Sequence, residues 1–152
     1  MIASLHEVCI APGTYTQNTD AFIAALNNPY VDILGHPGNP NYQYDYVAVI
    51  KEAARLKKLL EVNNYSFNTK HAFRAGSRDT CKKIIRLAME NGVRICVGSD
   101  AHFCANVGKL EQAKAALEEM DYPEEMIVSR NLASFKEYLK EREARLAVQK
   151  GI

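Results

Sequence analysis

Residues 31–40 read Val31-Asp32-Ile33-Leu34-Gly35-His36-Pro37-Gly38-Asn39-Pro40. The first four are mostly apolar and suit a short buried strand. Two glycines and two prolines follow. They exclude a continuing strand or helix, because proline lacks a backbone donor and fixes its own φ. Asp45 is then placed to cap a helix that runs to about Lys57. The segment predicts one unit of strand, rigid loop and helix.

The same order of elements repeats on both sides of this unit. The predicted strands are residues 2–8, 31–34, 59–63, 93–98 and 127–128. A polar loop is predicted over residues 64–76. The other predicted helices are one capped by Thr19 with Phe22, Ile23 and Leu26, one from Ser77 to Asn91-Gly92, one with Leu110, Ala113, Leu117 and Met120, and one marked by Leu132, Phe135 and Leu139.

Alternating strands and helices indicate an α/β protein with a parallel sheet and right-handed crossovers. The predicted strands are short and apolar on both faces, as a sheet covered on both sides requires. Two arrangements of the sheet remain possible, an open doubly wound sheet and a (β/α) barrel. No Gly-rich phosphate-binding motif follows any strand, which counts against a nucleotide-binding version. The length of 152 residues predicts one domain over residues 1–152.

The composition narrows the classes of partner. The chain is 47% apolar with a net charge of +1, so no general field attracts nucleic acid or an anionic membrane. Its four cysteines form no CxxC pair, which argues against a zinc knuckle or a redox motif. The sequence has no run of about 18 apolar residues and no signal peptide at its start. We expect a cytoplasmic protein with neither membrane nor nucleic acid as a partner.

Metal-competent side chains lie at the ends of three of the predicted strands. They are His6, His36, Asp100 and His102. In parallel β/α folds the carboxyl ends of the strands form the functional face. Imidazole and carboxylate groups suit zinc, manganese or iron. His6 alone could equally be a hydrogen-bonded core residue, but the four together predict a metal hydrolase site.

A second group of polar residues lies on the same predicted edge. Glu61 could point into the site or pair with a lysine of the next helix. Asn63 and Asn64 are candidate substrate-binding residues, although asparagine at a strand end often serves in turns. Arg74 could hold a phosphate with its planar guanidinium, or could be a solvated loop residue.

Three motifs in order resemble a known family. The segment from Asp32 to Pro40 contains HPGNP, the next motif reads Leu60-Glu61-Val62-Asn63-Asn64-Tyr65-Ser66-Phe67, and the last reads Val97-Gly98-Ser99-Asp100-Ala101-His102. They resemble PHP (polymerase and histidinol phosphatase) domains, especially the YcdX-like phosphatase branch. The resemblance covers essentially the whole chain.

The resemblance implies a fold and a mechanism. The fold would be the C-terminal part of a distorted (β/α)7, TIM-like barrel carrying up to three zinc or manganese ions. By this resemblance His6 and His36 would bind one metal, Asp100 a second and His102 a third. A metal-bound water, rather than a side chain, would be the catalytic nucleophile. Arg74 as a phosphate contact is inferred from its loop and not from a motif.

The chain also departs from the family pattern. The family domain begins with an H-x-H on its first strand, followed by further histidines and a bridging glutamate, and these have no counterpart here. We therefore expect a partial PHP domain that lacks the N-terminal strands and has an incomplete site. Open sheet edges expose unpaired backbone groups. They predict association with a second copy or with a complementary N-terminal fragment.

Two functions stay open at this point. The first is metal-dependent hydrolysis of a phosphate monoester, with a phosphorylated small molecule as substrate. The second is a non-catalytic fragment, or half of a split PHP protein, that binds metal weakly or not at all. A nuclease or proofreading role is a third option, and the near-zero net charge counts against it.

Overall fold

The computed structural model describes residues 1–68 and 75–150. A parallel sheet of four strands forms its centre, in the order β1-β2-β3-β4. The strands are β1 (Ile2–Ala3), β2 (Ile33–Leu34), β3 (Leu59–Asn63) and β4 (Ile95–Gly98). The helices are α1 (Tyr15–Asn27), α2 (Tyr46–Arg55), α3 (Ser77–Glu90), α4 (Glu111–Glu119) and α5 (Leu132–Lys150), with short 3-10 turns η1 (Asn64–Phe67), η3 (Cys104–Asn106), η4 (Glu124–Met126) and η5 (Val128–Arg130). The predicted α/β class with a parallel sheet is confirmed.

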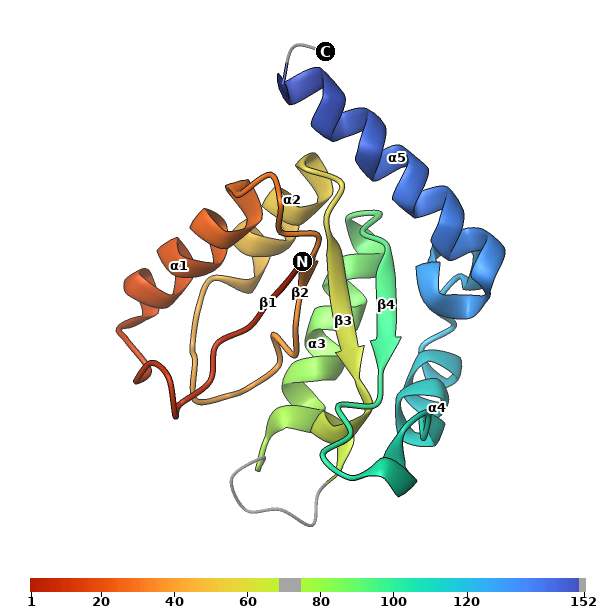
Figure 1. Ribbon diagram of the computed structural model, residues 1–152. Coiled ribbons are helices and arrows are strands. Elements are labelled where there is room, and N and C mark those ends of the chain that lie inside the picture. Colours follow the sequence, from red (N-terminus) through yellow and green to blue (C-terminus); the bar gives the residue numbers. More distant parts are fainter. Residues whose placement is uncertain (69–74, 151–152) are drawn as a thin grey trace.

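The strands are added in sequence order, each beside the one before it. A doubly wound sheet would instead reverse direction part of the way along. With right-handed crossovers, sequential addition places successive helices on the same face of the sheet. Figure 1 shows α1, α2 and α3 together behind the sheet.

The two faces of the sheet differ in chemistry. Residues paired across the strands share a face, and the row of Leu34, Leu60 and Ile95 packs into the core beneath the helices. The opposite row contains Ile33 with Leu59, and then Glu61 with Cys96. We call this opposite side the second face. It becomes polar toward the carboxyl ends of the strands.

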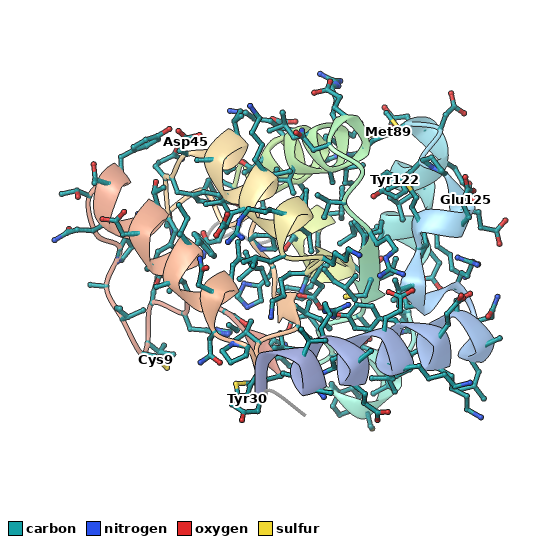
Figure 2. All side chains as sticks on the ribbon, turned by 90° about the horizontal axis from the view of Figure 1, so that it is seen from above. Cys9, Tyr30, Asp45, Met89, Tyr122 and Glu125 are labelled. Carbon is teal, nitrogen blue, oxygen red and sulfur yellow. The ribbon has the colours of Figure 1, made fainter. Side chains whose placement is uncertain are left out.

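Helix α5 covers the other end of the second face. Its Tyr138 is only 1% exposed and packs against Leu59 and Val128. The Tyr138 hydroxyl donates to the Asp32 carbonyl oxygen at 3.3 Å, and Arg142 Nε donates to the Asp32 carboxylate at 2.6 Å. Figure 2 shows α5 on the side of the sheet opposite α2 and α3. Within the two described ranges no helix is long and apolar enough to span a bilayer.

Several predicted boundaries hold and others do not. The cap at Asp45 is confirmed, because its carboxylate accepts from the Ala48 N–H at 3.0 Å. The cap at Thr19 is wrong, since α1 begins four residues earlier behind Thr14. Thr14 and Gln17 form a reciprocal capping box, which satisfies two free N–H groups at once. Thr19 Oγ1 instead donates to Tyr15 and accepts from the Asp45 N–H.

The first predicted strand is shorter than expected, and the last one does not form. β1 covers two residues, and the chain then turns, with the N–H groups of Cys9 and Ile10 both donating to the His6 carbonyl oxygen. Residues 127–128 make a single bridge, Ile95 to Ile127, and the chain continues as the 3-10 turn η5. Because one bridge does not fix an extended strand, the predicted strand at residues 127–128 is wrong.

Helix α5 is present as predicted, but its contact with the sheet runs through other residues. Leu132 is 66% exposed and Leu139 is 38% exposed.

Replacing Tyr138 by alanine should lower the free energy of unfolding by about 3 kcal/mol or more, because a buried aromatic ring is lost. Replacing the adjacent Leu139 by alanine should cost less than about 1 kcal/mol. Urea denaturation of both variants measures the difference, and equal losses would contradict this packing.

Candidate metal site at the carboxyl edge of the sheet

The four predicted metal ligands all lie in loops that leave the carboxyl ends of strands. His6 follows β1, His36 follows β2, and Asp100 and His102 follow β4. Because the strands are parallel, these ends meet at one edge of the sheet. That edge is at the bottom of Figure 1. The site is therefore built by loops on a common rim.

His6 and His36 are in direct contact. Their Nε2 atoms lie 3.1 Å apart, and their rings meet edge to face with centroids separated by 4.5 Å. The side chain of His36 is buried, whereas His6 is exposed. One nitrogen must donate and the other accept if the two rings share a proton. The same spacing allows both lone pairs to face one cation.

The loops that carry this pair are tied together by Glu7. Its Oε1 accepts from Asn41 Nδ2 at 2.6 Å and from Asn39 Nδ2 at 3.2 Å. Gly35 allows the segments after β1 and β2 to approach closely, since a methyl group at position 35 would lie 2.5 Å from Ser4 Oγ. Glu7 thus joins the loop after β1 to the loop after β2.

Glu61 fixes the position of His36 from the next strand. Its Oε2 accepts from the backbone N–H of His36 at 2.7 Å. His36 has a φ of 29°, in the left-handed region that non-glycine residues seldom adopt. Such backbone strain is typical of functional sites, where the surrounding contacts enforce it. Sequence reasoning left Glu61 open between the site and a lysine partner, and the structure shows its carboxylate bonded to the His36 backbone.

The carboxylate of Glu61 also lies against β4. A methyl group on Gly98 would stand 2.1 Å from Glu61 Oε1, so the carboxylate occupies the space a side chain would need. Cys96, paired with Glu61 in the sheet, is affected as well. Burial and then the Glu61 charge raise the pKa of the Cys96 thiol to about 12. The thiol therefore stays neutral at physiological pH.

Asp100 and His102 form a second pair. His102 Nδ1 lies 2.9 Å from the Asp100 carbonyl oxygen. A carbonyl can only accept, so Nδ1 carries the proton, and Nε2 of the neutral ring keeps its lone pair. In metal sites, a hydrogen bond from the ring nitrogen that does not bind the metal orients the histidine. Asp100 has a φ of 49°, a second left-handed backbone among the predicted ligands.

The two pairs do not merge into one cluster. Within residues 1–68 and 75–150 no three His, Cys, Asp or Glu side chains lie close enough together to hold an ion. The predicted ligands thus share a rim but form two separate pairs.

The predicted substrate-binding residues have other contacts. Asn63 is buried, and its Oδ1 accepts from the Ser66 N–H at 2.9 Å, which caps η1. Asn64 Oδ1 accepts from the N–H groups of Gln112 and Ala113 and so caps α4. The Asn63 contact is the local turn contact that the sequence also allowed, whereas Asn64 contacts α4, far along the chain. Arg74 lies outside the described residues, as does His71.

Comparison with known proteins supports the resemblance read from the motifs. A family model described as PHP-associated matches residues 79–110. A probable phosphatase of Clostridium botulinum is 44% identical over 142 residues, covering 93% of this chain and 57% of the relative. Probable phosphatases of Caldanaerobacter subterraneus and Acetivibrio thermocellus are 44% and 40% identical, each covering 96% of this chain and 57% and 59% of the relative.

The chain thus spans somewhat more than half the length of the curated relatives it matches. The similarity is spread over nearly the whole of this chain. The chain is therefore similar to a PHP-associated family model over residues 79–110 and, over most of its own length, to curated proteins named probable phosphatases.

Proposed function

We propose that this chain carries part of a metal-dependent phosphoesterase site, with His6, His36, Asp100 and His102 as metal ligands. The observation that carries the proposal is the contact between the Nε2 atoms of His6 and His36, 3.1 Å apart. Zinc–nitrogen bonds of about 2.0–2.1 Å allow two nitrogens at this distance to share one ion. The names of the relatives point to phosphate ester hydrolysis.

The donor set fits zinc or manganese. The family resemblance implies up to three such ions. When bound, such ions act as Lewis acids that activate water and offset phosphate charge. The chain's own residues have separate tasks in the proposal. Glu61 holds the backbone of His36 in place, and the Asp100 carbonyl group keeps His102 in the tautomer whose Nε2 can bind an ion. Arg74 remains the proposed phosphate contact.

A second candidate is a non-catalytic portion that holds metal weakly. The absence of a three-ligand cluster among the described residues favours it, because stable zinc sites usually use three or four protein ligands. Hydrolysis of p-nitrophenyl phosphate by this chain alone separates the two candidates. Activity that follows the metal content supports the first.

We also propose that the sheet is part of a distorted barrel whose inner side is the second face. Sequential strand order and the placement of α1, α2 and α3 on one side support this arrangement. Among the described residues β1 pairs only with β2, so its other edge is open. A second copy or a complementary N-terminal fragment would cover this edge.

Removing His36 should lower metal binding. We expect His36→Ala to bind at least about tenfold less zinc or manganese in equilibrium dialysis, because a donor atom is lost. Cys9→Ser is the matched control, since Cys9 is an exposed sulfur donor in the turn after His6. Equal metal content in both variants would remove the basis of the proposal.

The left-handed backbone of Asp100 predicts a difference between two substitutions. Asp100→Gly and Asp100→Ala both remove the side chain, but only glycine accepts a φ of 49° without strain. The glycine variant should be more stable than the alanine variant by about 1 kcal/mol, and both should lose metal.

Lys57 provides the control for this comparison, because it has a φ of 53° away from the rim. Lys57→Gly should raise stability and leave metal content unchanged. Thermal unfolding together with metal analysis measures both quantities. An alanine variant at position 100 as stable as the glycine variant would argue against strain at this site.

The open edge predicts self-association at micromolar concentration. Ile2 on β1 is 58% exposed, and Ile2→Lys should weaken association, because a charged side chain blocks edge pairing. Val148→Lys, on the exposed end of α5, is the control and should have no effect. Light scattering that finds only a monomer at these concentrations would speak against self-association.

A further inference from the structure

A small cavity lies where the C-terminal half of α5 meets the amino end of the sheet. It has a volume of about 30 Å³, and its walls come from the end of α1, the turn between α2 and β3, and α5. Figure 1 shows the C-terminal half of α5 at the top, away from the rim that carries the proposed metal ligands. A cavity of about 10–15 Å³ already admits one water molecule, so this one has room for a small ion.

Three cations and no carboxylate line the cavity. They are Lys58 from the turn before β3 and Arg142 and Arg145 from α5. The Asp32 carboxylate offsets one of these charges through its bond with Arg142 Nε at 2.6 Å. Burial lowers the pKa of Lys58, Asp32 counteracts this effect, and the charges of Arg145 and Arg142 lower the pKa further. The three cations are therefore close enough to one another to repel.

Lys58 supplies charge to the cavity but no free N–H group. Its side chain is buried, and its ammonium donates to the carbonyl oxygens of Asn28 at 3.1 Å, of Pro29 at 3.4 Å and of Val31. An ammonium has three N–H donors, and these three carbonyl groups use them. Donors for a ligand must therefore come from the two arginines.

Arg145 has a donor atom that finds no acceptor among the described residues. Its Nη1 atom is buried and makes no hydrogen bond there. Glu141 Oε2 lies 3.9 Å from this atom, which is beyond hydrogen-bond distance, and both Glu141 oxygens accept from Arg94. A buried donor without an acceptor is destabilising. An anion beside Arg145 would supply the acceptor.

We propose that this cavity binds a small inorganic anion of about the size of chloride, held by Arg142 and Arg145 beside Lys58. The anion would offset the surplus positive charge, because buried charges are stable only when they are paired. It would also join α5 to the end of α1 and to the turn before β3. The site is at the opposite end of the strands from the proposed metal ligands and does not depend on the proposed function.

Thermal unfolding of the full chain tests this site, with chloride replacing gluconate at constant ionic strength. Constant ionic strength keeps the screening of surface charges fixed, and gluconate is too large for the cavity. Chloride that binds only the folded chain should raise the Tm with increasing concentration. Arg145→Gln should weaken chloride binding at least about tenfold, because a charge-assisted hydrogen bond is lost.

Lys140→Gln is the matched control. It also removes one positive charge from α5, but Lys140 is exposed and does not line the cavity. The rise in Tm with chloride should be the same in Lys140→Gln as in the unaltered chain, and smaller in Arg145→Gln. Equal rises in the two variants overturn the proposal.

Chloride-35 NMR is a second readout that needs no variant to fold. Chloride bound to the unaltered chain should broaden the resonance, and bromide, a halide of similar size, should compete and narrow it. A line width that the protein does not change, at up to about 0.15 M chloride, overturns the proposal, as does broadening that bromide does not reduce.

Discussion

The hydrogen bond from the His36 backbone N–H to the Glu61 carboxylate joins the fold to its candidate site. It crosses from the loop after β2 to the middle of β3, and it holds a histidine in a backbone conformation that is unfavourable by itself. A charged acceptor makes such a bond stronger than one between neutral groups. Without it, the loop after β2 would be free to relax, and the contact between His6 and His36 would no longer be enforced.

The two pairs of proposed metal ligands are joined in different ways. His6 and His36 contact each other across neighbouring strands, whereas Asp100 and His102 are joined through a backbone carbonyl group after β4. Two donors hold an ion weakly compared with the three or four of complete zinc sites. The curated relatives are longer than this chain, and in the proposed function such additional chain would supply further ligands.

The sequence predicted best where local and tertiary signals agreed. β3 and α3 follow the predicted boundaries because their apolar periodicity and end signals coincide, as at Asn91-Gly92. Thr19 was misleading, because a threonine inside a helix can bond to the preceding turn, and the capping box at Thr14 starts earlier. The contact surface of α5 was not predictable from its leucines, since one buried tyrosine and its arginine neighbours make the tertiary contact. The role of Glu61 depends on cross-strand register, which no local pattern contains.

The space between Glu61 and Gly98 links two positions that are far apart in the chain. The carboxylate fills the volume that any side chain at position 98 would need. A methyl group at position 98 would force the Glu61 carboxylate to shift from its place, whereas a shorter residue at 61 would leave room for that group. The two positions should therefore vary together during divergence, so that loss of the acid on β3 would release the constraint on β4.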